Sequence, residues 1–294
     1  MPDPASAIST ICGSITAYFG VRFSKTTTSR RPRGAFPSII QRSVFRNNHT
    51  LDWGPEGLFE TIGCLERGGI RTTGAGPDIP AARSPAVIQG REGGRVLVLG
   101  VGSPTSGIPD NWEVGDERPG LNLVKVLSTA AADRIAERLA AVSKSGDVRI
   151  LSIHWGTNWG YEIPDGFRAF AHRLIESGNV DVVHGHSSHH VRPIEIYRDK
   201  LILYGCGDFV NDYEGIGGHE RYRGDLACMF FPTIDPATGK LLRLRIVPLR
   251  SRRLRLEWVS KGDLRWLAES LTGMGGKWRC SFEVQADGNL SLVR

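Results

Sequence analysis

The sequence predicts an α/β fold in which helices cover a layered, partly parallel sheet. Two short apolar runs rich in β-branched residues, 148–153 and 180–183, are predicted to be buried strands. An amphipathic segment lies between them, with Pro164 at its start and Gly178 at its end, as is typical of a helix. The strands of such a β-α-β unit are parallel and buried. Because mostly β segments follow, we expect a second, partly antiparallel sheet.

The chain before this unit supplies two helices, a strand and a long loop. From residue 47 a polar loop leads into a helix, for which Asp52 is the candidate N-cap. Residues 95–101 are predicted to be a buried strand. The Gly- and Pro-rich residues 102–120 form a loop long enough to be functional. Ser128 is expected to cap the second helix.

The chain after the unit is predicted to be mostly β. Residues 194–197 and 201–204 flank a short turn and should form a β-hairpin. A short helix is expected at 263–271, and a final hairpin turns through 287–289. The remaining predicted strands are 227–232, 242–247 and 254–259. Six arginines are interpreted as solvated faces of these late strands, with a rim for an anionic ligand as the alternative: Arg243, Arg245, Arg250, Arg252, Arg253 and Arg255.

The composition is that of an ordinary globular protein. Apolar residues make up 40% and charged residues 23% of the 294 residues, which is typical of globular domains. No apolar run approaches the roughly 20 residues that span a bilayer, and no secretory signal is evident. The five cysteines are scattered and form no CxxC pair, which argues against a disulfide framework. We therefore expect a cytoplasmic location and no membrane segment.

The basic charge is confined to the N-terminal leader. The net charge is +6, and residues 1–46 carry seven of the 37 basic residues but one of the 31 acids, so the two balance at 30 each over the remainder. A nucleic-acid binder should show a basic face on its folded domain. We therefore expect no nucleic-acid partner. Residues 1–46 are interpreted as a basic leader, which is a disordered tail, a transit-like peptide or a stretch foreign to the fold. Residues 47–294 are interpreted as the folded domain.

Histidines concentrate beyond the ends of the two central strands. Six of the eight histidines lie in residues 148–213, and four of these lie within 184–190. Ligands gather beyond the carboxyl ends of parallel strands, so His154 should lie beside the His186-x-x-His189 turn. Converging neutral imidazoles are what a catalytic metal site needs. A lone histidine would more often be a core residue, and only the cluster favours a metal. His184 and His190 are interpreted as supporting or surface residues.

A second polar cluster, Asn48–His49, precedes the first helix. A loop asparagine can give its side-chain oxygen to a metal, and the adjacent histidine can donate a proton to a leaving group. In isolation the same residues would be only a turn. Asp208 follows a buried strand and is either a hydrogen-bond partner of a metal ligand or a turn cap. His172 is expected to be structural and His219 to lie at the surface.

With these residues in view, the chain resembles the CapA family of capsule and poly-γ-glutamate synthesis proteins, which have the calcineurin-like metallophosphatase fold. The resemblance covers residues from about 47 to about 248. Eight segments match family landmarks in the right order: NNHTLDWG, GLFETI, GIRTTGAG, SIHWG, FAHRLIESG, VDVVHGHSSHH, PIEIY and LILYGCGDF.

The resemblance implies an α/β/β/α sandwich with a metal centre at one edge. It implies one or two divalent ions, Mn, Zn or Fe, held by Asn48, His154, His186 and His189, with His49 as the proton donor. The further residues expected to support the metal or to contact substrate are Asp52, Trp155, Asn158, His184, His190, Glu195 and Asp208.

The chain departs from the family pattern in three places. The commoner family loop reads GHHPH, and its final His-Pro-His falls here on Ser187, Ser188 and His189, so His186 must replace an imidazole. Asn158 stands where many members carry an acid. The family's opening strand ends in a Gly-Asp motif, and no such motif precedes Asp52. We therefore expect the first strand or strands of the fold to be missing.

Two functions of different classes follow from the resemblance. The first is a metal-dependent hydrolase of phosphoester or polymer amide bonds in capsule or poly-γ-glutamate biosynthesis. The second is a non-catalytic component that binds the anionic polymer or supports a capsule-synthesis complex, and it is motivated by the missing carboxylate. Family members are often membrane-anchored or extracytoplasmic, whereas this sequence by itself predicts a cytoplasmic protein.

Overall fold

The computed structural model describes residues 47–90, 94–209, 217–278 and 280–293, and the backbone of three short strands before them. These strands are β1 (Tyr18–Phe19), β2 (Arg22–Phe23) and β3 (Arg42–Val44). β1 and β2 pair in parallel with β13 (Leu226–Ile234), and β3 pairs in parallel with β4 (Arg71–Thr73). The other residues of the predicted leader lie outside the described part of the chain.

A six-stranded sheet forms the centre of the described structure. Its order is β11-β12-β10-β9-β7-β6. The four inner strands are parallel, and β6 and β11 are antiparallel to their neighbours. The predicted β-α-β unit and the following hairpin are therefore confirmed. The strands are β6 (Ala86–Gln89), β7 (Arg95–Gly102), β9 (Val148–His154), β10 (Val182–His186), β11 (Ile194–Tyr197) and β12 (Lys200–Leu203).

A second sheet of seven described strands, β1 and β2 included, is built mainly from the C-terminal part of the chain. β13 pairs with β14 (Leu241–Arg252), which also pairs with β17 (Leu290–Val293) and with β15 (Arg255–Trp258). β16 (Ser281–Val284) pairs with β17 as the predicted final hairpin. Apart from the parallel β1 and β2, these pairings are antiparallel, as the sequence predicted.

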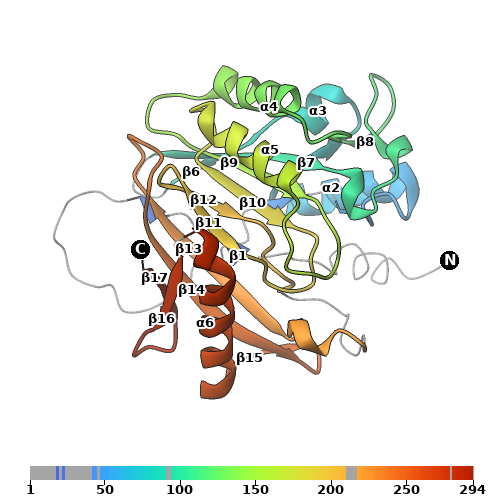
Figure 1. Ribbon diagram of the computed structural model, residues 1–294. Coiled ribbons are helices and arrows are strands. Elements are labelled where there is room, and N and C mark those ends of the chain that lie inside the picture. The colour runs from blue at the N-terminus through green and yellow to red at the C-terminus, as the bar shows by residue number, and fades with distance from the viewer. Residues whose placement is uncertain are drawn as a thin grey trace.

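The two sheets and the helices form layers around two cores. α4 (Thr129–Val142) and α5 (Asp165–Glu176) cover one face of the six-stranded sheet (Figure 1). Alternate strand residues such as Leu97 and Leu151 pack against these helices, and their neighbours such as Ile150 face the second sheet, including Phe230 and Leu244. α6 (Lys261–Gly275) packs against β16 and β11 and joins the core between the sheets. The predicted layered α/β class is confirmed.

A small unit beside the sheet carries the first helix. Its core contains Leu58, Ile108 and Leu121. Its helices are α2 (Gly54–Arg67) and α3 (Ile79–Arg83), and its strands are β4, β5 (Ala75–Gly76) and β8 (Gly120–Leu121). The 3₁₀ helices are η1 (Pro104–Ser106) and η2 (Asp110–Trp112) in the predicted long loop, and η3 (Glu220–Tyr222) and η4 (Gly276–Trp278) farther on.

The helix ends test the predicted caps. Ser128 caps α4 by accepting from the Ala131 amide, as predicted. The prediction for α2 is wrong: Trp53 occupies the N-cap position, without a side-chain cap, because the Asp52 carboxylate bonds His49 instead. Gly178, in the left-handed region with φ +75°, follows α5 as expected. No helix within the described ranges is both long and apolar enough to cross a bilayer.

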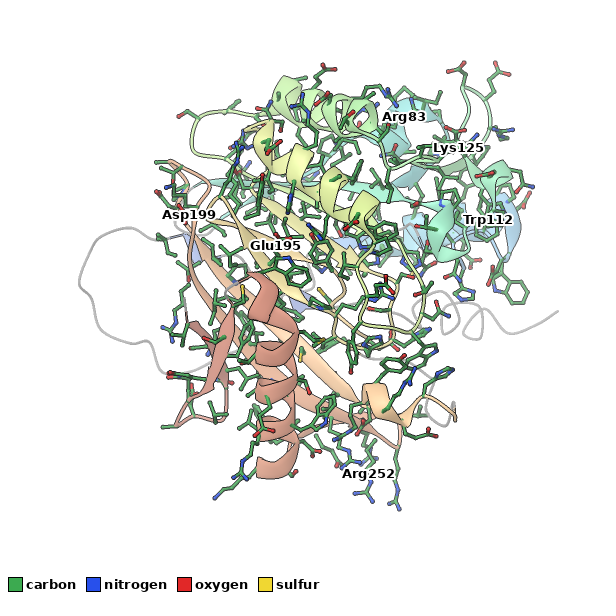
Figure 2. All side chains as sticks on the ribbon, viewed as in Figure 1. Arg83, Trp112, Lys125, Glu195, Asp199 and Arg252 are labelled. Atoms are coloured by element: carbon green, nitrogen blue, oxygen red, sulfur yellow. The ribbon has the colours of Figure 1, made fainter. Side chains whose placement is uncertain are left out.

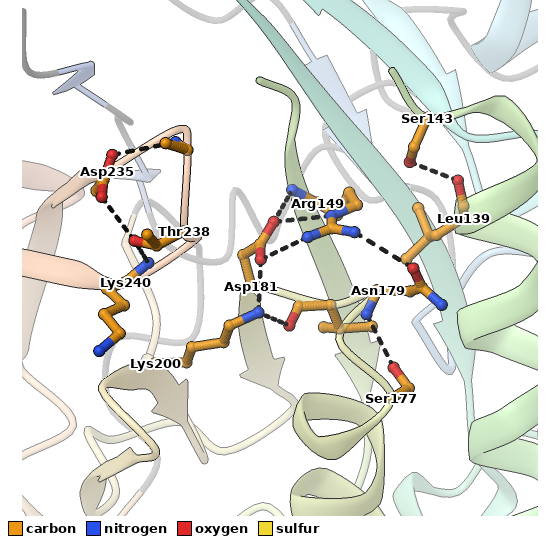
Figure 3. Close-up of polar contacts among 12 residues, drawn as sticks. Leu139, Ser143, Arg149, Ser177, Asn179, Asp181, Lys200, Asp235, Thr238 and Lys240 are labelled. Atoms are coloured by element: carbon orange, nitrogen blue, oxygen red, sulfur yellow. Dashed lines mark hydrogen bonds and ion pairs between the residues drawn. The ribbon is translucent and has the colours of Figure 1, made fainter. Parts of the chain in front are cut away.

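Buried ion pairs close the amino end of the central sheet. Asp181, fully buried, accepts hydrogen bonds from the Arg149 guanidinium (2.9 Å) and from Lys200 Nζ (2.7 Å) (Figure 3). Arg95 Nε donates similarly to Asp147 (2.9 Å). These contacts fix the starts of β7, β9, β10 and β12 relative to one another, and with them the register at which the opposite strand ends emerge.

Candidate functional site

Two histidines meet at the carboxyl end of the central sheet. His154 ends β9 and His186 ends β10, and the parallel register places them directly beside each other. Their Nδ1 atoms lie 3.0 Å apart and their ring centroids 5.0 Å apart. Both side chains are buried. The structure thus brings together the two imidazoles that the sequence placed at neighbouring strand ends.

The strand periodicity explains why these side chains share a face. Successive residues of a strand point to opposite faces, so His154 continues the row of Val148 and Ile150 that faces the second sheet. His184 and His186 continue the row of Val182 in the same way. His184 Nδ1 lies 2.7 Å from Ser152 Oγ. The face between the sheets is therefore apolar over most of its length and becomes imidazole-rich at its carboxyl end.

The His154–His186 pair fits two neighbouring ligand positions of one divalent ion. With metal–nitrogen bonds of about 2.1 Å, two nitrogen ligands at a right angle lie about 3 Å apart. That is the separation of the two Nδ1 atoms. Among the described residues, no group of three or more His, Cys, Asp or Glu side chains is placed to hold an ion. What the described ranges show at this place is a close pair of imidazoles.

His189 is oriented by a carboxylate. Its Nδ1 lies 2.8 Å from Asp208 Oδ2, and both side chains are largely buried. Carboxylates bonded in this way orient imidazole ligands of metals. Asp208 was expected to be either a hydrogen-bond partner of a histidine or a turn cap, and in the structure it is the hydrogen-bond partner of His189. The His189 amide donates to the Asn158 carbonyl (3.0 Å), and Ser187, a non-glycine residue with φ 126°, bonds the Gly156 carbonyl. The loops after β9 and β10 are therefore tied together.

His190 is a structural histidine. Its Nδ1 lies 3.1 Å from the Val191 carbonyl, and its Nε2 accepts from the Gly160 amide. The side chain is fully buried, and this burial lowers its pKa to about 4. The neutral ring stacks with Trp159 and Tyr222. Since both nitrogens have backbone partners, His190 supports the loop after β9.

The Asn48–His49 turn approaches the same edge from the small unit. His49 Nδ1 lies 2.8 Å from Asp52 Oδ2, and both side chains are more than a third exposed. Asn48 lies beside Gly107, at the end of a loop whose Ser103 amide donates to the His154 carbonyl (2.9 Å). The structure thus pairs His49 with a carboxylate and brings Asn48 to the loop that contacts His154.

Two of the predicted site residues lie on the helix-covered face instead. Trp155 is buried there, stacks on Phe167 and Tyr204, and donates to the Tyr204 carbonyl. Glu195 bonds Tyr204 (2.6 Å) and His172 of α5 (2.9 Å). His172 is structural, as expected. Trp155 follows His154, and Glu195 follows Ile194, each of which faces the second sheet. Because successive residues of a strand point to opposite faces, Trp155 and Glu195 do not lie on the face that carries the histidine pair.

Arg192 is a site neighbour that the sequence analysis missed. It is 3% exposed, and its guanidinium donates to the carbonyl and hydroxyl oxygens of Thr157 (both 2.8 Å). Burial lowers the pKa of this guanidinium. Arg192 therefore fastens the loop after β9. The signal in the sequence was a single arginine directly after the histidine turn, between apolar residues.

Comparison with known proteins identifies the family. The sequence model of the family described as "Bacterial capsule synthesis protein PGA_cap" matches residues 43–213. This range contains every residue discussed above as a candidate ligand or proton donor. It agrees with the predicted resemblance.

Curated relatives carry related names. A protein of Mycobacterium tuberculosis named "Probable polyglutamine synthesis accessory protein" is 45% identical over 248 residues, which are 84% of this chain and 65% of the relative. The "PGA biosynthesis protein CapA" of Bacillus subtilis is 26% identical, over 74% of this chain and 53% of the relative. The "Capsule biosynthesis protein CapA" of Bacillus anthracis is 25% identical, over 56% and 39%. The chain thus spans about two thirds or less of the length of these relatives.

Proposed function

Because this chain belongs to the bacterial capsule synthesis protein family PGA_cap, we propose that it acts in the synthesis of a capsule or polyglutamate polymer as a metal-dependent hydrolase. The observation that supports a metal is the His154–His186 pair, with nitrogens 3.0 Å apart at the ends of adjacent parallel strands. Asn48 and His189 are the further proposed ligands. The names of the relatives support the pathway.

The proposed chemistry divides between the ion and the chain. One or two divalent ions, Mn, Zn or Fe, would supply an activated water for cleavage of a phosphoester or polymer amide bond. His49 would donate a proton to the leaving group. The Asp52 carboxylate, 2.8 Å from Nδ1, holds the orientation of the His49 ring. Asp208 would hold the His189 ring in the same manner.

A non-catalytic accessory role is the second candidate. It is supported by the pairing of only two imidazoles among the described residues and by the name of the Mycobacterium tuberculosis relative, an accessory protein. In this role the chain would bind the anionic polymer or support a capsule-synthesis complex. The cytoplasmic location expected from the sequence stays a prediction.

Metal content tests the site directly. The full chain, purified with and without added manganese or zinc, should contain about one or two equivalents of metal by elemental analysis. The variant His154→Ala/His186→Ala should lose it, because it removes both central ligands. His219→Ala is the matched control, since this histidine stacks on Trp159 instead. Equal metal content in the double variant and the wild type would overturn the assignment.

Activity separates the two candidates. A hydrolase should cleave a phosphoester or poly-γ-glutamate substrate in the presence of metal and stop on chelation. His49→Ala should lower kcat by about a hundredfold or more, the usual contribution of a general acid. A chain that binds metal and polymer but hydrolyses neither substrate would favour the accessory role.

A further inference from the structure

The hairpin formed by β14 and β15 ends in a tip that projects beyond its sheet. β13 begins at Leu226, opposite Arg250, so from Arg252 onward the two hairpin strands pair only with each other among the described strands. The tip consists of Arg252, Arg253, Leu254 and Arg255. Figure 2 shows Arg252 at one extremity of the molecule, far from Lys125 and Trp112 near the predicted long loop.

The tip keeps residues that are unfavourable for a hairpin. Arg253 and Leu254 have φ of 52° and 58°, in the left-handed region. Two-residue turns of this kind normally use Asn-Gly or Asp-Gly, which adopt positive φ at low cost. Arg252 lies directly opposite Arg255, and like charges in that position destabilise a sheet. Costs of this kind are tolerated where a segment has a function.

The same hairpin exposes large apolar side chains. Trp258 is 75% and Leu254 63% exposed, and they are two of the three most exposed large hydrophobic residues in the described ranges. Single exposed hydrophobic residues need no explanation. Here they lie within seven residues of three arginines, and the hairpin has one acidic residue, Glu257.

The arginines of the tip differ from those elsewhere on β14. Arg250 pairs with Asp225 (3.0 Å), and the Arg245 guanidinium lies over the Phe231 ring (4.8 Å). In contrast, no ion pair joins Arg252 or Arg255 to an acid of the described chain. Arg252 and Arg255 are therefore solvated, as the sequence analysis expected, and are available for the alternative that it named, contact with an anionic ligand.

The geometry points to a membrane-docking hairpin, whose arginines contact the headgroups of anionic lipids while Leu254 and Trp258 enter the interface. Basic residues near an anionic bilayer gain electrostatic attraction, and tryptophan is favoured at the level of the headgroups. A soluble anionic polymer would satisfy the arginines but leave both apolar side chains in water. The combination therefore favours a lipid surface.

Vesicle co-sedimentation of the full chain tests this inference. The wild type should bind vesicles of phosphatidylcholine with phosphatidylglycerol, more weakly at high salt, and should not bind phosphatidylcholine alone. Arg252→Gln/Arg255→Gln should weaken binding roughly fivefold for each arginine, and Leu254→Ser/Trp258→Ser should weaken it as well. The matched control is Leu242→Ser/Arg243→Gln, an exposed leucine and arginine on the other end of β14 that should leave binding unchanged.

The outcomes are distinct. Loss of binding in both hairpin variants with an intact control supports the inference. Equal binding to neutral vesicles, no binding to either vesicle, or an equal loss in the control overturns it. Binding to soluble polyglutamate instead of vesicles, lost in the arginine variant, also overturns it in favour of a polymer site. If a hairpin variant does not fold, the lipid and salt dependence of the wild type still decides.

Discussion

The two ends of the central sheet use buried polar residues in opposite ways. At the amino end, the Asp181 carboxylate forms ion pairs with both Arg149 and Lys200. At the carboxyl end, His154 and His186 direct ring nitrogens toward each other at 3.0 Å. One end pairs opposite charges, and the other gathers imidazoles, which in their neutral form can bind a cation.

This difference teaches where stability and function reside. Breaking a buried ion pair leaves an uncompensated charge, so the amino end should dominate the free energy of unfolding. Neutral imidazoles carry a smaller penalty and gain most when a cation binds. The comparison predicts large stability effects at one end and ligand-dependent effects at the other.

The largest effect should come from Asp181→Ala. The Asp181 side chain is 0% exposed. Its removal leaves the charges of Arg149 and Lys200 without their buried carboxylate, so the free energy of unfolding should fall by about 3–5 kcal/mol. Urea denaturation measures it. Asp165→Ala is the control, because Asp165 is 95% exposed beside Arg168 and should change stability by less than about 1 kcal/mol. Equal effects of the two substitutions would break the comparison.

Asp147→Asn should have a smaller effect that depends on pH. Burial raises the pKa of this carboxyl, but hydrogen bonds from Arg95 and the Lys144 amide outweigh it, so the pKa lies below its ordinary 3.8. Asp147 therefore stabilises the fold above that pH, and its contribution is lost as the pH falls through the lowered pKa. At neutral pH the variant should lose about 1.5–3 kcal/mol.

Urea midpoints at several pH values measure this dependence. The gap between wild type and Asp147→Asn should be constant near neutral pH and narrow in acid below pH 3.8. A gap that widens as the pH falls would contradict the sign of the shift.

The smallest effect on the metal-free protein should come from His154→Ala/His186→Ala. This variant removes the buried 3.0 Å contact between the two rings, and we expect a loss of about 1–2 kcal/mol. Added manganese or zinc should then stabilise the wild type by about 2.7 kcal/mol at a hundredfold excess over Kd, and leave the double variant unchanged. Equal stabilisation of both proteins would remove the contrast between the two ends.

The local elements could be predicted from the sequence to a large extent. Periodicity and end signals located the β-α-β unit, the hairpin at 194–204 and the Ser128 cap, and the structure confirms them. The resemblance located the family. The N-cap of α2 could not be predicted, because Asp52 can bond either an amide of its own helix or His49, and the tertiary position of the turn decides between them.

Side-chain partners across the sheet depended on tertiary structure. Because side chains alternate along β11 and β12, Glu195 lies on the face of the sheet that does not carry His186. Which face carries the histidines follows only from the packing of the two sheets. Arg192 and the Arg149–Asp181–Lys200 cluster join residues from separate segments of the chain. No local pattern encodes such contacts.

The sequence by itself determined the family, the order of strands and helices, and the presence of histidines at two strand ends. Those features depend on local periodicity and on short motifs. The tertiary structure alone decided that His154 and His186 are register partners, that Asp208 orients His189, and that the β14–β15 tip projects from its sheet. The physical reason is that register and sheet packing are set by long-range pairing, which fixes distances that no spacing along the chain contains.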